Sequence, residues 1–186
     1  ETDHNIHGTI FMPSPTPSQK VSQVSMFGGK NITIKIVGDI YDDSYEASLV
    51  YSKKHKKTFI HPFDDEDVII GQGTMALEIL NQSLFPIDYL LVPIGGGGLI
   101  SGMINVFKQK SPKTRIIGIE PKGAPSMYES MKQNKRITLD RIDNFVDGAA
   151  VKTIGKISFD YCSKFLDDIV IVDEGEICQN ILTMYN

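Results

Sequence analysis

Residues 88–102, which read Asp-Tyr-Leu-Leu-Val-Pro-Ile-Gly-Gly-Gly-Gly-Leu-Ile-Ser-Gly, decide the fold of this 186-residue chain. The apolar run from Tyr89 to Ile94 predicts a parallel strand that is buried on both faces, because its residues do not alternate with polar ones. Four glycines follow the run, and residues 99–107 have the apolar spacing of a helix. The stretch therefore predicts a strand, a glycine turn and a helix in direct succession.

The glycine turn has the properties of an anion-binding site. Backbone N–H groups at a helix start have no partner within the helix, and the helix dipole adds partial positive charge there. Glycine has no Cβ atom to keep a phosphate group at a distance, and it adopts positive φ angles readily. Ordering four glycines loses much backbone entropy, which a plain connection would seldom justify. The turn is therefore predicted to bind a phosphate or another anion.

Spacing alone leaves two interpretations of this turn open. In the first it is a dinucleotide turn, because Gly96, Gly98 and Gly102 have a G-x-G-x-x-x-G spacing. Glu120 would then end the next strand, where a ribose-binding acid is expected. In the second interpretation the turn is a cup for the phosphate of a smaller cofactor. A glycine pattern without further context does not distinguish a nicotinamide-binding domain from a site for the phosphate of a smaller cofactor.

The composition excludes several function classes. A net charge of −4 argues against a general nucleic-acid surface, and 41% hydrophobic with 23% charged residues is typical of a globular protein. No apolar run reaches membrane-spanning length, so no membrane partner is expected. Cys162 and Cys178 make neither a disulfide framework nor a CxxC metal site. They indicate reduced thiols in a cytoplasmic protein.

Predicted strands and helices alternate along the chain. This order predicts the α/β class, with parallel sheets and helices on both faces. The predicted strands are residues 8–12, 31–37, 58–60, 89–94, 115–120 and 168–172. The first helix is predicted to be capped by Ser18 and ended by Gly28 and Gly29. The later helices are predicted at residues 45–55, 68–81, 99–107, 126–133, 157–165 and 174–185.

Several motifs, in the same order along the chain, resemble one enzyme family. Residues 94–102 resemble the tetraglycine loop of the threonine/serine dehydratase and serine racemase family, pyridoxal-phosphate enzymes of fold type II. The resemblance extends from about His7 to the end of the chain. Further matches are residues 61–65 and 68–79 ("PPFDD" and "VIAGQGTxALEI" in the family), 117–121 ("IIGVEP"), 146–149 ("ADG") and 165–170 ("VDDIV").

The resemblance implies a fold and a cofactor site. Residues 1–57 would be part of a small α/β domain, and residues 58–186 part of a large α/β domain that binds the cofactor phosphate, as in tryptophan synthase beta-like enzymes. The cofactor would be pyridoxal 5'-phosphate. Its phosphate would be held by Gly95, Gly96, Gly97, Gly98 and the Leu99 backbone, while Gly148 would leave room beside the ring. The family also implies a homo-oligomer, a dimer or a tetramer.

The resemblance also implies a reaction. Within the family the motifs favour a threonine dehydratase, which converts L-threonine to 2-oxobutanoate and ammonia by β-elimination; serine dehydratase or racemase is an alternative. The family's "S-F-K-x-R-G-A" segment, whose lysine forms the Schiff base, does not occur in this sequence. No catalytic residue is therefore assigned, and the chain alone is expected to be inactive. A truncated subunit or an association module, driven by unpaired sheet edges, is the other interpretation.

A cation site is a further expectation from the resemblance. Relatives bind a monovalent or divalent cation with a glutamate at the position of Glu120 and a carbonyl at the position of Ala124. The family's next ligand is a carboxylate, but this sequence has Ser126 there. Hard cations need several oxygen ligands, so a strand-end carboxylate without a metal is the competing interpretation.

Overall fold

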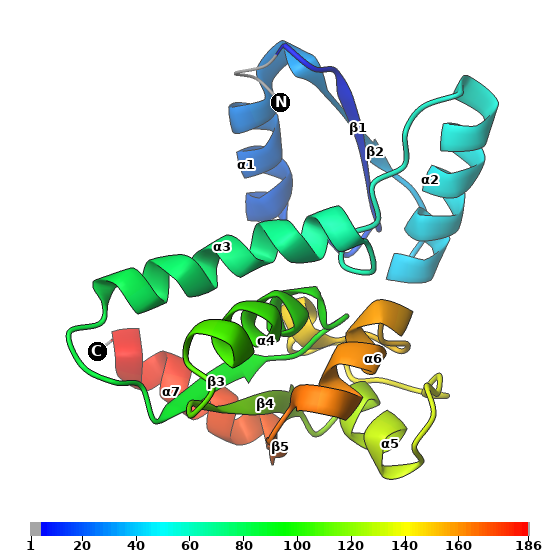
Figure 1. Cartoon of the computed structure of the whole chain (residues 1–186). Helices are drawn as coiled ribbons and strands as arrows, with labels where there is room; N and C mark the ends of the chain where they lie inside the picture. Colours follow the sequence, from blue (N-terminus) through cyan, green and yellow to red (C-terminus); the bar gives the residue numbers. More distant parts are fainter. Residues whose placement is uncertain (1–4, 186) are drawn as a thin grey trace. The chain divides into compact units, whose positions relative to one another are not determined.

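The computed structural model describes residues 5–185 and divides into two compact units, Glu1–Phe59 and Ile60–Asn186. Figure 1 shows the elements of each unit. The expectation that residues 1–57 and 58–186 are parts of a small and a large domain stays a prediction, and residues 1–4 and 186 of those ranges lie outside the described part.

The first unit is a two-stranded parallel sheet with flanking helices. Strand β1 (Gly8–Met12) pairs with β2 (Ile32–Ile36), with Gly8 opposite Ile32. Helices α1 (Ser18–Gly28) and α2 (Tyr41–His55) lie on either side of the strands (Figure 1), and the 3-10 turn η1 (Gly29–Asn31) leads into β2. The cap predicted at Ser18 is wrong: Pro17 precedes the helix and no side chain caps it.

The second unit contains a three-stranded parallel sheet in the order β3-β4-β5. Parallel pairing follows from the intervening helices, because a crossover brings the chain back to the same end of the sheet. Its elements are α3 (Glu66–Gln82), β3 (Tyr89–Pro93), α4 (Gly98–Lys110), β4 (Arg115–Pro121), α5 (Ser126–Lys132), the 3-10 turn η2 (Asp147–Ala149), α6 (Lys156–Phe165), β5 (Asp168–Val172) and α7 (Glu174–Tyr185). The predicted α/β class with parallel sheets is confirmed.

The hydrophobic core of this unit lies between the sheet and helices α4 and α6. Helix α4 is almost wholly enclosed, because α3 covers its outer side at a close crossing. A Cβ atom added to Gly102 would lie 2.6 Å from the Gly73 nitrogen and 2.6 Å from the Ile69 oxygen. The fully or nearly fully buried members of the core are Ala76, Val92, Ile94, Ile100, Met103, Ile104, Phe107, Ile116, Met127, Ile154 and Cys162.

Three details of the sequence prediction are wrong. Strand β3 is not buried on both faces: Val92 is buried, but Tyr89 and Leu91, which point to the opposite face, are 59% and 64% exposed. Residues 58–60 form no strand. Helix α2 begins at Tyr41 rather than Tyr45. The Asp43 carboxylate accepts from the N–H groups of residues 39 and 40, which precede the helix. Local sequence pattern does not reveal which face of a strand other elements cover.

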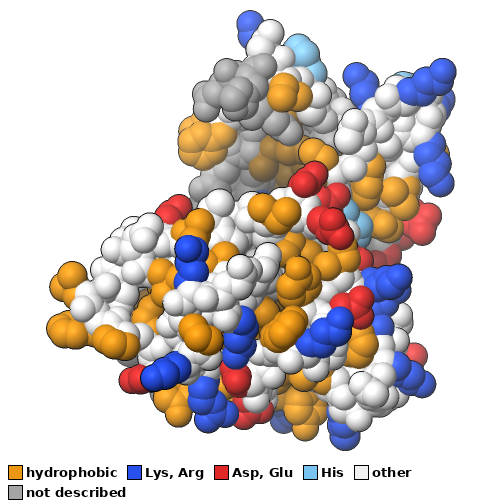
Figure 2. All heavy atoms as spheres, in the orientation of Figure 1, with side chains coloured by type: hydrophobic (Ala, Val, Ile, Leu, Met, Phe, Trp, Pro, Cys, Tyr) orange, Lys and Arg blue, Asp and Glu red, His pale blue; other side chains and the backbone are white. Residues whose placement is uncertain are grey.

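Large apolar side chains also remain on the surface of the second unit. Leu84 and Phe85 are 89% and 79% exposed in the connection between α3 and β3, and Met184 and Tyr185 are each 88% exposed near the end of α7. Figure 2 shows apolar side chains scattered among charged ones on the face in view. None of the helices within residues 5–185 combines the length and apolar character that crossing a bilayer requires.

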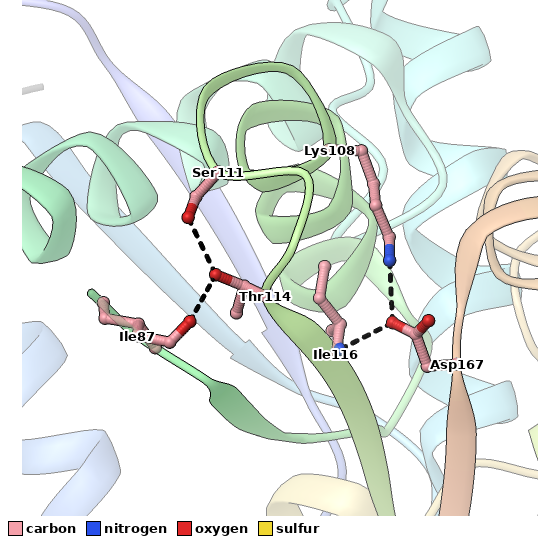
Figure 3. A network of polar contacts seen from close by, with 6 residues as sticks. All are labelled: Ile87, Lys108, Ser111, Thr114, Ile116 and Asp167. Carbon is pink, nitrogen blue, oxygen red and sulfur yellow. Dashed lines mark hydrogen bonds and ion pairs between the residues drawn. The ribbon is translucent and has the colours of Figure 1, made fainter.

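Polar side chains connect α4 with the starts of the three strands of the second unit (Figure 3). The Thr114 hydroxyl donates to the Ile87 carbonyl at 2.7 Å and therefore accepts from Ser111 Oγ at 2.9 Å. Asp167 Oδ2 accepts from Lys108 Nζ and from the Ile116 N–H, both at 2.7 Å. This network fixes the ends of the strands that lie opposite the glycine turn.

The charge of Asp167 should make stability depend on acid pH. Burial opposes ionisation of Asp167, but the hydrogen bonds from Lys108 and Ile116, with the charges of Lys108 and Arg115, outweigh it and lower its pKa. A lowered carboxyl pKa stabilises the fold above the unfolded-state pKa of about 4 and loses that contribution as the pH falls through the folded-state value.

Asp167→Asn should therefore reduce the free energy of unfolding by about 1 kcal/mol at pH 7, since Asp167 is partly exposed. At pH 3 the variant and the native chain should differ less. Urea unfolding at both pH values measures this, with Asp160→Asn on the exposed side of α6 as the control. An equal loss at both pH values would show that the charge of Asp167 is unimportant.

Candidate functional site

The glycine turn joins the carboxyl end of β3 to the amino end of α4. The Ile94 N–H still donates to the Ile119 carbonyl at 2.8 Å, so the sheet holds the chain up to the first glycine. Gly97 then caps α4 with φ +94° and ψ 1°, in the left-handed region that other residues rarely adopt. The prediction of a strand, a glycine turn and a helix in succession is confirmed at this point.

Each glycine of the turn is also in close contact with another part of the unit. A Cβ on Gly95 would lie 2.8 Å from the Gly148 carbonyl oxygen, and one on Gly97 would lie 2.5 Å from Ser158 Cβ. Phe63 lies against the other two, with its ring over Gly96 and its carbonyl oxygen 2.9 Å from a Cβ on Gly98. The four glycines therefore allow close packing as well as the turn itself.

The amide groups of the turn have no acceptor in the described part of the chain. None of the hydrogen bonds among residues 5–185 is donated by the N–H groups of Gly95, Gly96, Gly97, Gly98 or Leu99. Gly96, Gly97 and Gly98 are buried. Buried N–H groups are nearly always paired, and here they lie at the positive end of a 13-residue helix. The geometry therefore fits an anion such as a phosphate group.

Asp64 connects α6 to the glycine turn. Its two carboxylate oxygens accept from the Lys156 and Ile157 N–H groups, both at 2.8 Å, which caps the start of α6. The Gly155 N–H donates to the Gly96 carbonyl at 3.0 Å, so the same helix end is bonded to the turn. Phe63 and Asp64 thus fix the turn from two sides.

His61 keeps this segment in shape. Its Nδ1 accepts from the Phe63 N–H at 3.2 Å and from the Asp64 N–H at 2.8 Å. Burial lowers the pKa of His61, although the charges of Asp64 and Asp65 act in the opposite direction. The neutral ring with an unprotonated Nδ1 is the form that accepts both bonds. His61 is therefore a loop-forming residue.

Glu120 is fully buried at the end of β4. Its Oε1 and Oε2 accept from the Met127 and Tyr128 N–H groups at 2.8 and 2.7 Å, at the start of α5. Burial raises the pKa of Glu120 to about 7, against these two hydrogen bonds. The Ala124 carbonyl accepts from the Ser126 N–H at 3.0 Å. Among residues 5–185 there is no cluster of three His, Cys, Asp or Glu side chains suited to a metal, and a cation at Glu120 and Ala124 stays a prediction.

The comparisons with known proteins identify the family. The sequence profile described as "Pyridoxal-phosphate dependent enzyme" matches residues 3–186. This chain belongs to that family. The match sets aside the nicotinamide-binding interpretation of the glycine turn, and the family's cofactor is pyridoxal phosphate.

Similar proteins include threonine dehydratases and serine racemases. The chain is 55% identical over 181 residues to the "L-threonine dehydratase biosynthetic IlvA" of Halalkalibacterium halodurans, and 51% identical to that of Bacillus subtilis. Both alignments cover 97% of the chain but only 44% and 43% of the relatives. The chain thus spans less than half the length of these curated relatives.

Solved structures agree with the fold class. The processed form of threonine deaminase isoform 2 from Solanum lycopersicum has a TM-score of 0.82 at 40% identity, covering 91% of this chain and 48% of that one. Maize serine racemase has a TM-score of 0.89 at 32% identity, covering 98% and 54%. The chain has the fold of part of a fold type II pyridoxal-phosphate enzyme.

The structure brings most of the predicted site residues together. Gly95 to Leu99 form the turn, and Gly148 in η2 lies against Gly95 with open space where its Cβ would be. Glu120 lies in the same unit, where it caps α5. The sequence prediction missed the roles of Asp64 and Ser158. Asp64 was visible as part of the "PPFDD" resemblance, but its partner helix lies too far along the chain for any local pattern to show the contact.

Removing the Asp64 carboxylate should destabilise the second unit. Asp64→Ala leaves two N–H groups of α6 without an acceptor and should reduce the free energy of unfolding by about 1–2 kcal/mol. Asp64→Asn retains one oxygen acceptor, so its loss should be smaller. Urea unfolding followed by circular dichroism measures both, with Asp67→Asn on the exposed side of α3 as the control. Equal stability of Asp64→Ala and the control would exclude this role.

Glu120 should make the chain less stable at pH 7 and above than at pH 5. Since its folded-state pKa of about 7 lies above its unfolded value, its contribution to stability is lost as the pH rises from about 4.5 through 7. Glu120→Gln should show a smaller loss of melting temperature between pH 5 and 8 than the native chain. If a cation binds here, KCl or MgCl2 should raise the melting temperature at pH 8 for the native chain but not for Glu120→Gln.

Proposed function

We propose that the turn formed by Gly95 to Gly98, with the Leu99 N–H, binds the phosphate of pyridoxal 5'-phosphate. The observation that carries this proposal is the row of amide groups without acceptors at the start of α4. Several N–H groups directed at one anion, at the positive end of a helix, form a phosphate site in many proteins. Gly148 leaves space beside Gly95, where the cofactor ring can lie.

We propose further that this chain serves a threonine dehydratase, which converts L-threonine to 2-oxobutanoate and ammonia. The names of the two threonine dehydratases that share 55% and 51% identity with this chain support this substrate over serine. When bound, pyridoxal phosphate withdraws electrons and stabilises negative charge at the α-carbon of the amino acid. The residues described here contribute phosphate binding and the rigid packing around it. The lysine motif of the family does not occur in this sequence, so we expect no turnover by this chain alone.

Three further expectations belong to the same proposal. The two units contribute to a small and a large domain respectively, and a homo-oligomer in the cytoplasm is the expected state. A monovalent or divalent cation would bind at Glu120 and the Ala124 carbonyl. Buried carboxylates prefer a counter-charge, which supports a cation near Glu120.

The phosphate site is tested with pyridoxamine 5'-phosphate, which has no aldehyde that could react with surface lysines. Calorimetry should show binding of pyridoxamine 5'-phosphate and much weaker binding of pyridoxamine. Gly97→Ala should abolish the difference and also lower the melting temperature, because alanine strains the positive φ angle and collides with Ser158. Gly71→Ala is the matched control, because a Cβ at this position of α3 meets nothing within 4 Å. Equal affinities for the two compounds would overturn the site.

The reaction is tested with the natural polypeptide that carries this chain. Incubated with pyridoxal phosphate, it should form 2-oxobutanoate from L-threonine faster than pyruvate from L-serine. Preference for serine, or racemisation without loss of ammonia, would contradict the threonine dehydratase proposal while leaving the phosphate site intact.

A further inference from the structure

Ser158 lies in the first turn of α6 and packs directly on the glycine turn. The whole residue is buried. A Cβ added to Gly97 would lie 2.5 Å from Ser158 Cβ and 2.9 Å from Ser158 Oγ, so the hydroxyl is beside the residue that caps α4. Ser158 belongs to none of the motifs recognised in the sequence.

The hydroxyl of Ser158 has no hydrogen-bond partner among the described residues. Its Oγ is one of three buried side-chain atoms in residues 5–185 that lack one. Buried hydroxyl groups are almost always paired, because an unpaired one loses its bonds to water without replacement. In comparison, the Ser101 hydroxyl in α4 is equally buried and donates to the Gly97 carbonyl at 2.7 Å.

The nearby polar groups are already engaged with one another. The Asp64 carboxylate accepts from the Lys156 and Ile157 N–H groups, and the Gly96 carbonyl accepts from Gly155. Gly97, which lies beside Ser158, belongs to the turn whose amide groups have no acceptor among the described residues. A hydroxyl group can donate as well as accept, and an unpartnered hydroxyl next to amides without acceptors is an arrangement that a bound anion satisfies.

We propose that the Ser158 hydroxyl donates a hydrogen bond to the phosphate group bound at the glycine turn. This inference rests on the proposed phosphate site and adds a side-chain ligand from α6 to the backbone donors of the turn. A hydrogen bond to a charged oxygen is stronger than a neutral one, so this single contact has a measurable effect on affinity.

Ser158→Ala separates this role from a purely structural one, because the two predict different results. If the hydroxyl serves the phosphate, the variant should bind pyridoxamine 5'-phosphate about tenfold more weakly. Its affinity for pyridoxamine should be unchanged, and its melting temperature without ligand should be equal or higher. Inorganic phosphate, followed by ³¹P NMR, should show the same loss.

Two further variants complete the test. Ser158→Cys has nearly the same shape and a weaker donor, and should also weaken phosphate binding. Ser163→Ala, on the exposed side of α6, should bind like the native chain. Unchanged affinity in Ser158→Ala and Ser158→Cys would overturn this inference alone. Absence of phosphate-dependent binding in the native chain would overturn the phosphate site itself, and this inference with it.

Discussion

The central constraint on the second unit is a row of buried N–H groups that the fold leaves without acceptors. They arise because β3 passes into α4 through Gly97, whose backbone is in the left-handed region, and because Gly96, Gly97 and Gly98 are buried. Leaving such groups unpaired destabilises the protein by itself. An anion at this position restores the missing interactions, which links the stability of the unit to the binding of its ligand.

Two independent physical effects favour glycine at the four positions of this turn. Close approach of a phosphate is one of them. The other effect is packing within the protein, since Phe63, Gly148 and Ser158 occupy the space that side chains on the turn would need. A substitution in the turn would therefore disturb the packing even in the absence of any cofactor. Conservative replacement of one glycine cannot be expected to affect binding alone.

Much of this fold could be predicted from the sequence, because the decisive signals are local. The glycine turn and the long apolar helix after it follow from neighbouring residues, and the motif order indicated the family. The exposed face of β3 could not be predicted, since both faces are apolar in sequence and only the tertiary structure decides which face other elements cover. For the same reason the contact between Asp64 and α6 was missed: its partners are separated by 92 and 93 positions.

The crossing of α3 and α4 limits the motion of the segments that form the proposed site. At Gly73 and Gly102 the backbones of the two helices are in direct contact, which restricts sliding of one helix along the other. Helix α3 begins just after Phe63 and Asp64, and α4 begins at the turn, so both parts of the site are attached to one rigid joint. The conformational entropy of the glycines is thus lost when the chain folds, so the proposed phosphate site is formed before any ligand binds.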